Sequence, residues 1–168
     1  MTENIEELAP HEYEELDRYI SELERLERIH RAEVDLYYFA WEYFSEVGNP
    51  GNGGNWDGFT LESPDLAPWF HSEICGIMDD VSLRNRNGRV CVAAPRGHAK
   101  SSFLSKAFPL REIVFRSRKY IIILSETPKL AMSNMEWLSL QLKHNKKLRD
   151  DFGPLLSPKK QENPKDNS

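Results

Sequence analysis

The chain has 168 residues, of which 39% are hydrophobic and 29% are charged, a composition that suits one domain with a real core and excludes a wholly disordered chain. Its two cysteines, Cys75 and Cys91, lie too far apart in sequence to indicate a zinc site or a disulfide framework, and a reducing compartment fits. The longest apolar runs fall far short of the ~18 residues that span a bilayer, and the acidic start, MTENIEEL, is unlike a secretory signal. We therefore expect a soluble cytoplasmic protein that is not secreted.

Charge is unevenly spread along the chain. The net charge is −5, and residues 1–33 carry eleven acidic and four basic side chains. Residues 84–119, in contrast, carry ten basic side chains and the single acid Glu112. A local field of this sign suits an anionic partner such as phosphate or nucleic acid, although a set of solvated surface charges explains it as well.

The first part of the chain, residues 1–47, is predicted to be a helical segment. No proline or glycine interrupts residues 13–47, where apolar side chains recur at spacings of three and four: Leu16, Ile20, Leu23, Val34, Tyr37, Trp41 and Phe44. The pattern is interrupted around Glu27 and His30, so two helices or one bent helix both fit. We expect the aromatic half to pack in the core, and the acidic half either to face solvent or to dock a partner.

A glycine-rich stretch, residues 48–58, is predicted to be a flexible loop because it holds five of the nine glycines. Residues 59–153 then read as a second unit. A helix there can be capped by Ser63 or Asp65 and carries an apolar stripe of Phe70, Ile74, Ile77 and Val81. Residues 85–88 follow as a turn.

Two apolar runs in this unit predict a parallel sheet. Residues 89–94 (RVCVAA) read as a short buried strand with Cys91 in the core, and residues 120–124 (YIIIL) read as a second strand, apolar on both faces. Between them, residues 100–115 are predicted to be helical, with a kink or restart at Pro109. Strand, helix and strand form a right-handed βαβ unit, so the expected fold class is α/β, P-loop NTPase-like, with an incomplete parallel sheet.

The C-terminal part is predicted to be a helix followed by a tail. Thr127 and Pro128 form a helix start, and the helix should run to about residue 147 with Ala131, Met135, Leu138 and Leu142 on one face. Residues 154–168 contain three prolines and are expected to be disordered.

The loop between the first strand and its helix, APRGHAKSS, has the features of a phosphate-binding loop. Such a loop needs convergent backbone N–H groups, a helix N-terminus, a lysine and a hydroxyl for Mg²⁺. Here Lys100 would reach the β- and γ-phosphates of ATP, and Ser101 would bind Mg²⁺. The candidate binding residues are Ala94, Pro95, Arg96, Gly97, His98, Ala99, Lys100, Ser101 and Ser102.

Glycines usual in such loops are replaced by alanine at two positions. Gly97 can adopt a positive φ or allow close approach of a phosphate. We expect Ala99 to lie in the right-handed region, where its methyl group costs little, and Ala94 to end the strand without a special backbone angle.

The segment APRGHAKSS resembles the Walker A motif of the large terminase subunit, the ATP-driven DNA-packaging motor of tailed bacteriophages. The similarity continues through LSKAFPLREIVF, YIIILSET, PKLAMSNM and NKKLRDDFG, and extends upstream to WFHSEICGIM, so it covers about residues 60–153. The resemblance implies an ATPase domain followed by a nuclease domain in the complete subunit, which acts in the cytoplasm of the bacterial host. It also implies double-stranded DNA, the small terminase subunit and the portal protein as partners.

The resemblance also suggests roles for side chains near the loop. Arg96 matches the loop arginine that is a candidate cis-acting finger on the γ-phosphate, although a surface charge or a plain phosphate contact fits equally well. His98 is expected to pack within the loop. Trp69 and Phe70 could flank the adenine, but Phe70 belongs to the helix stripe and is expected to lie in the core.

One motif of the family has no counterpart in this sequence. No apolar strand ending in Asp-Glu follows residue 124, and Asp150 and Asp151 come after a basic helix end. We therefore expect a nucleotide-binding N-terminal part of a terminase that does not turn over ATP or cut DNA by itself. Another P-loop ATPase, such as a helicase-like one, or a non-catalytic interaction module are the alternatives.

Overall fold

A computed structural model describes residues 9–52, 59, 63–84 and 88–155, and the regular elements among these residues are helices, with no strand. The elements are α1 (Pro10–Val34), α2 (Leu36–Phe44), the 3₁₀ turn η1 (Pro64–Leu66), α3 (Trp69–Leu83), the π-helical segment η2 (Ser102–Ala107), α4 (Phe108–Val114), α5 (Pro128–His144) and α6 (Lys146–Phe152). None of the described helices is both long and apolar enough to cross a membrane.

The predicted α/β fold with a parallel sheet is therefore wrong. Residues 89–94 and 120–124 are extended, but no neighbouring strand among the described residues pairs with them. Ile121 and Ile123 are half-buried, whereas Tyr120, Ile122 and Leu124 are 81%, 65% and 88% exposed. An apolar run shows that a segment can form a strand, but the ladder also needs a partner at hydrogen-bonding distance, which the sequence pattern does not report.

The N-terminal helical segment divides at Asp35, not at Glu27 and His30, which both lie inside α1. Asp35 has extended backbone angles (φ −128°, ψ 100°), and its N–H donates to Arg31 O at 3.0 Å. Its carboxylate accepts a hydrogen bond from the N–H of Tyr38 at 2.8 Å. One aspartate therefore ends α1 and caps α2, which allows the two helices to point in different directions.

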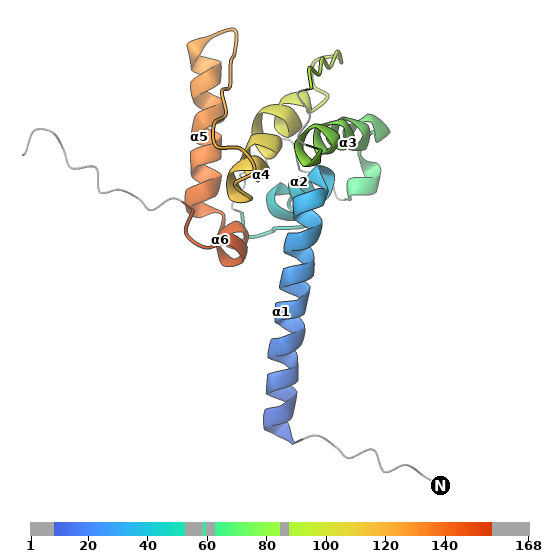
Figure 1. Ribbon diagram of the computed structural model, residues 1–168, viewed down its shortest axis with the longest axis vertical. Helices are drawn as coiled ribbons and strands as arrows, with labels where there is room; N and C mark the ends of the chain where they lie inside the picture. Colours follow the sequence, from blue (N-terminus) through green and yellow to red (C-terminus); the bar gives the residue numbers. More distant parts are fainter. Residues whose placement is uncertain (1–8, 53–58, 60–62, 85–87, 156–168) are drawn as a thin grey trace, which may run out of the picture.

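The core is built around α2, which lies among the other helices in Figure 1 and contacts α1, α3, η2 and α4. Trp41 and Phe44 of the predicted aromatic stripe are buried, whereas Tyr37 is half-buried and Val34, at the end of α1, is 43% exposed. The rings of α2 pack against rings from later parts of the chain: Phe39 against Phe115 at 6.3 Å, Tyr43 against Phe152 at 5.8 Å and Phe44 against Trp137 at 5.2 Å. The aromatic helix thus gathers the rest of the chain around it.

A buried carboxylate, Asp151, ties α6 to α1 and α2. Its oxygens accept hydrogen bonds from Arg28 Nε and Nη2 at 2.8 and 2.7 Å and from the Tyr43 hydroxyl at 2.7 Å. Arg25 Nη2 donates to the Asp151 carbonyl at 2.7 Å. The hydrogen bond with Asp151 raises the pKa of Arg28, and burial raises the pKa of Tyr43, so both groups keep their protons and remain donors at neutral pH.

The helix that follows the loop is continuous through Pro109, in line with its predicted extent of 100–115. Its central part, η2, is π-helical and leads directly into α4. Proline has no N–H to donate and its ring crowds the preceding turn, and the wider π turn lies immediately before it. The π-helical segment therefore lies next to the position at which the proline would otherwise break the helix.

A buried ionic cluster joins this helix to α3. The Arg111 guanidinium contacts the Asp79 carboxylate and lies 3.3 Å from Glu112 Oε1. Ser82 Oγ donates to Glu112 at 2.7 Å, and Arg118 Nε lies 3.5 Å from the same carboxylate. Burial raises the pKa of Asp79, although the contact with Arg111 acts in the opposite direction.

The start of the glycine-rich stretch is anchored. Asn49 Nδ2 donates to Tyr43 O at 3.0 Å and to Asn145 Oδ1 at 2.8 Å, and Asn52 Nδ2 donates to Gln141 Oε1 at 3.2 Å. These side chains are buried, so residues 49–52 form a packed turn. Residues 53–58, the turn residues 85–87 and the tail from residue 156 lie outside the described residues.

The remaining predicted helices are present with different bounds. The helix expected to run to about residue 147 ends at His144, and Asn145 caps the separate helix α6. Thr127 caps α5 by accepting from Leu130 N at 3.3 Å, whereas Ser63 caps η1 and α3 begins only at Trp69. The predicted α5 stripe is only half correct, because Leu138 is buried and Met135 is 52% exposed. Asn134, Trp137 and Gln141 cover the core face instead.

The two thiols should differ in reactivity. Burial in α3 raises the pKa of the Cys75 thiol, whereas Cys91 lies exposed on the extended segment and not in a core strand. We expect Cys91 alone to react quickly with a disulfide reagent at pH 8, because it is exposed, whereas Cys75 is buried and its raised pKa opposes thiolate formation. Cys91→Ser should remove the fast phase and Cys75→Ser should preserve it. Slow reaction of both thiols in the native protein would show that residue 91 is buried after all.

Replacement of the buried carboxylate should destabilise the fold. Asp151→Ala leaves Arg28 and the Tyr43 hydroxyl without their acceptor, and we expect the free energy of unfolding to fall by roughly 3 kcal/mol. Asp150→Ala is the matched control, since Asp150 is the exposed neighbour on the same helix. It should change stability by less than about 0.5 kcal/mol. Equal effects of the two variants in urea unfolding would contradict the role given to Asp151.

Candidate phosphate-binding loop

Residues 94–99 connect the extended segment to the helix that begins at Lys100. Gly97 has φ 80°, so the positive φ expected for it is confirmed. Ala99 has φ 52°, so the expectation of a right-handed conformation at this position is wrong. The methyl group of Ala99 is therefore held in the left-handed region that glycine adopts without strain. Ala94 does not end a strand, because residues 89–94 pair with no strand in the part of the chain that the structure describes.

The loop presents free backbone donors to solvent. Among the described residues, no protein acceptor meets the amide groups from Gly97 to Ser101, and the first bonded amides of the helix are those of Ser102 and Phe103, which donate to Ala99 O at 3.0 and 3.3 Å. A Cβ built on Gly97 would have no atom within 4 Å, so the space in front of the loop is open. Unpaired N–H groups at a helix start are the donors that bind a phosphate.

The Lys100 ammonium lies across the loop. Its Nζ donates to the carbonyl oxygens of Ala94 and Pro95. The side chain thus turns back to the first residues of the loop, where its charge is held by two carbonyl oxygens. To reach a phosphate, the ammonium would exchange two carbonyl acceptors for anionic oxygens, which form stronger hydrogen bonds.

A histidine that sequence reasoning did not single out holds the loop against α3. His71 is 6% exposed, and its Nε2 lies 3.0 Å from the carbonyl oxygen of His98. His98 Nδ1 in turn lies 3.0 Å from Arg96 O, and the His98 ring lies 5.8 Å from that of Phe70. Nothing in the sequence pattern distinguishes His71 from an ordinary helix residue, because its partner is 27 positions away.

A cavity of about 300 Å³ lies beside the loop, between α3 and the extended segment. Its walls are mostly apolar: Phe70, Ile74, Ile77, Cys91, Val92, Ala93 and Ala94, with Glu73 as the charged member. Phe70 is half-buried, so it lies at this wall and not in the core as expected. Trp69 is 76% exposed at the start of α3.

The basic segment is partly neutralised within the protein. Arg111 is buried against Asp79 and Glu112, and Arg84 forms an ion pair with Asp80 at 3.0 Å. The exposed bases of the segment among the described residues include Arg89, Arg96, Arg116 and Lys119. Arg96 therefore lies on the loop with its charge available to an anion.

The hydroxyls of the loop differ in access. Ser101 is exposed one residue after Lys100, whereas Ser102 is buried. Within the described ranges, no three His, Cys, Asp or Glu side chains gather to form a metal site. A magnesium ion at this loop would therefore take the Ser101 hydroxyl and draw its other oxygens from the phosphates and water, as Mg²⁺ commonly does.

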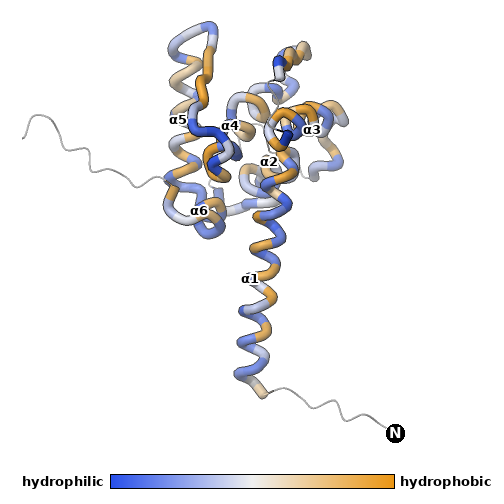
Figure 2. Tube along the Cα trace, in the orientation of Figure 1, coloured by the Kyte–Doolittle hydropathy of each residue, from blue (hydrophilic) through white to orange (hydrophobic). Residues whose placement is uncertain are grey.

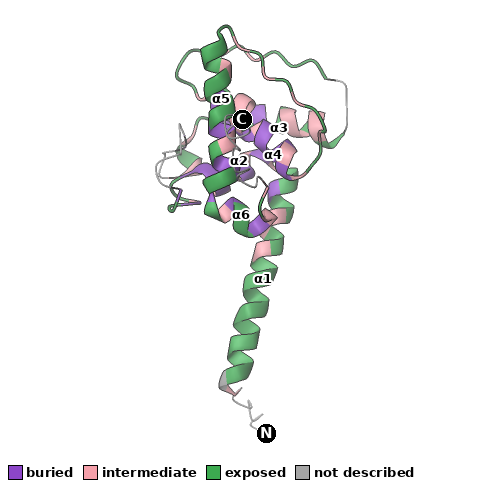
Figure 3. Ribbon diagram, turned by 90° about the vertical axis from the view of Figure 1, so that its left-hand side faces the viewer, coloured by how far each residue is buried: buried purple, intermediate pink, exposed green. Residues whose placement is uncertain are grey.

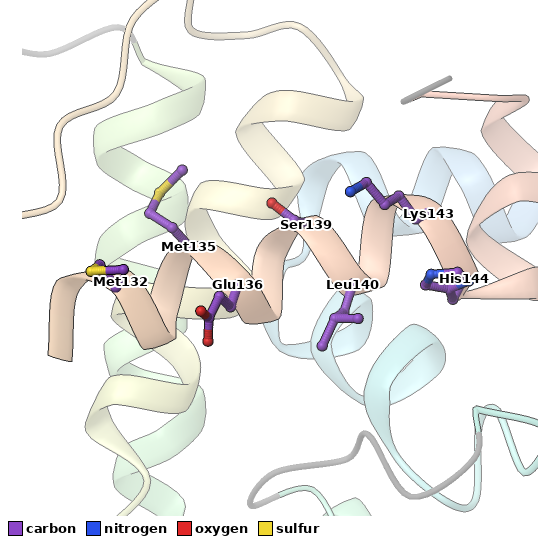
Figure 4. Close-up of a pocket in the computed structure, with 7 residues that line it drawn as sticks. All are labelled: Met132, Met135, Glu136, Ser139, Leu140, Lys143 and His144. Carbon is purple, nitrogen blue, oxygen red and sulfur yellow. The ribbon is translucent and has the colours of Figure 1, made fainter. Parts of the chain in front are cut away.

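A second hollow lies along α5, lined by Met132, Met135, Glu136, Ser139, Leu140, Lys143 and His144 (Figure 4). All of these side chains come from one helix at spacings of three and four, so they form a stripe along one face of α5 and do not converge on one position. The hollow lacks the converging polar groups that bind a small ligand. The loop at 94–102 is accordingly the stronger candidate site.

No protein-family model, curated protein sequence or solved structure matches this chain.

The backbone angles of the loop predict opposite effects of two substitutions. Ala99→Gly should raise the free energy of unfolding by roughly 1 kcal/mol, because it removes a Cβ from a left-handed residue, and Gly97→Ala should lower it by a similar amount. Denaturant unfolding measures both changes.

Two controls separate strain from the general effect of glycine. Ala93→Gly, in the extended segment, should lower stability through backbone entropy alone, and Gly76→Ala, in the exposed part of α3, should raise it. If Ala99→Gly destabilised the protein as Ala93→Gly does, the strain assigned to Ala99 would be absent.

Proposed function

We propose that this protein binds ATP with magnesium through residues 94–102 and serves as the nucleotide-binding part of a DNA-packaging motor of the terminase type. The observation that carries the proposal is the loop: amides from Gly97 to Ser101 that meet no acceptor among the described residues, at the start of a helix whose Lys100 ammonium turns back onto the same loop at Ala94 and Pro95. The sequence resemblance over residues 60–153 supports the terminase assignment. The proposal does not rest on a sheet, since the described residues form none.

Each group in the loop has a defined part in this proposal. The free amides donate to phosphate oxygens, and Lys100 supplies a positive charge against the β- and γ-phosphates. The Ser101 hydroxyl holds the magnesium ion, which neutralises phosphate charge when bound. Arg96 lies close enough along the loop to add a second charge on the terminal phosphate.

The cavity beside the loop offers a place for the base of the nucleotide. Its apolar walls start at Ala94, where the loop begins, and include the Phe70 ring on α3. His71 holds His98 and thereby keeps the loop next to this cavity. A nucleotide could then place its phosphates on the loop and its base against α3, which is the arrangement the flanking residues favour.

Loss of the lysine should weaken nucleotide binding. Calorimetric titration with Mg-ATP should show an affinity at least tenfold lower for Lys100→Ala than for the unmodified protein, since a hydrogen bond to a charged group contributes about 1.5–3 kcal/mol. His98→Ala should have a much smaller effect, because its ring contacts the loop and not the phosphates. AMP should bind more weakly than ATP, since it lacks the β- and γ-phosphates that the loop would contact.

The control is Lys129→Ala, which removes an exposed lysine in the first turn of α5, away from the loop. It should leave the affinity unchanged. Equal affinities of the unmodified protein and Lys100→Ala for Mg-ATP, with the fold intact by circular dichroism, would rule out the phosphate-binding assignment.

A further inference from the structure

The helix α1 leaves the body of the protein and presents an apolar stripe that nothing in the described part of the chain covers. Figure 1 shows α1 extending away from the other helices, and every residue from 11 to 24 is exposed, as the green colouring in Figure 3 shows. Six large apolar side chains on it are between 42% and 63% exposed: Tyr13, Leu16, Tyr19, Ile20, Leu23 and Leu26. A helix this exposed would ordinarily be polar on all sides.

The stripe is continuous and has the spacing of a helix-binding surface. Tyr13, Leu16, Ile20 and Leu23 follow one another at intervals of three, four and three, and Tyr19 and Leu26 widen the same face. Orange and blue segments accordingly alternate along α1 in Figure 2. At 1.5 Å per residue, residues 13–26 extend for roughly 20 Å. Anchors at these intervals are how one helix packs against another.

Acidic side chains border the stripe on both edges. At 3.6 residues per turn, Asp17 and Glu24 lie along one edge, and Glu15 and Glu22 lie along the other. Glu22 pairs with Arg25 at 2.9 Å. The two arginines nearest the body, Arg25 and Arg28, are bound to Asp151. The free part of the helix, residues 10–24, therefore keeps six acidic side chains and the single base Arg18.

The distribution of charge on α1 indicates which kind of partner can bind the stripe. A second copy of this helix would bring acidic edges together in either orientation, since both edges carry carboxylates, and like charges at these positions oppose pairing. Nucleic acid and anionic lipid surfaces are repelled for the same reason. We propose that residues 13–26 of α1 are a docking site for a basic amphipathic helix of a partner protein. Its apolar face covers the stripe, and its Lys or Arg side chains meet the acidic edges.

The experiment uses two synthetic 18-residue peptides as probes. Both carry leucine at the a and d positions of a heptad repeat, and they differ in having lysine or glutamate at the e and g positions. Fluorescence anisotropy of the labelled peptides should show that the basic peptide binds the full chain and the acidic peptide does not. Binding should weaken as salt is raised, because charge contributes to it.

Two pairs of substitutions test the stripe and its edges separately. Ile20→Ser with Leu23→Ser should lower the affinity for the basic peptide at least tenfold, whereas Leu140→Ser on α5, a side chain of similar exposure (45%), should not change it. Asp17→Lys with Glu24→Lys keeps the stripe and should also lower the affinity at least tenfold. Asp150→Lys on α6 is the matched control for charge. Circular dichroism verifies that α1 remains helical in each variant.

Three results would overturn the proposal. One is failure of the basic peptide to bind. A second is equally tight binding of the basic peptide to the Ile20→Ser, Leu23→Ser protein, because it would show that charge alone holds the peptide. A third is self-association of the unmodified chain in sedimentation that the same serine pair abolishes, since it would make a second copy the occupant.

Discussion

The structure depends on the need to cover the broad apolar face of α2. Six of its nine residues are buried: Leu36, Phe39, Ala40, Trp41, Tyr43 and Phe44. At 3.6 residues per turn these six span about 200° of the helix circumference, and Tyr38 and Glu42 on the remaining side are half-buried. A short helix with so wide an apolar face is stable only where other elements pack against it. The helices α1, α3, η2 and α4 contact it directly, and Trp137 of α5 and Phe152 of α6 complete the shell.

Ion pairs and hydrogen bonds of carboxylates hold the helices together at the edge of this shell. Asp151 binds Arg28 and Tyr43, and Asp79 binds Arg111 and the N–H of Leu36 at 3.2 Å. Each carboxylate bridges helices that are distant in sequence. Because a buried charge without a partner is costly, these contacts select one arrangement of the helices among several that the apolar core alone would allow. The same contacts remove Arg28 and Arg111 from the protein's external charge, which leaves α1 acidic towards its free end.

The candidate site is positioned by α3 and the extended segment, and not by a sheet. His71 and Phe70 on α3 contact the loop, and the segment before it lines one wall of the neighbouring cavity. The left-handed conformation at Ala99 shows that the loop keeps its bend even where its sequence lacks the glycine that would adopt it without strain. The loop is therefore shaped by its surroundings as well as by its own residues.

The sequence alone determined which segments are helical, where α5 starts and the order of loop and helix around Lys100, but not the breaks at Asp35 and Asn145. Local signals carry this information: the Thr127–Pro128 start of α5, the aromatic pattern of α2, and the Gly97 and Lys100 pair before a helix. Only the tertiary structure decided whether residues 89–94 and 120–124 become strands, because a ladder needs a partner segment at hydrogen-bonding distance. It also decided that His71 meets His98 and that Asp151 meets Arg28, since contacts between residues 27 and 123 positions apart depend on how the helices pack around α2. Periodicity records which side of an element is apolar, but not which other element will cover it.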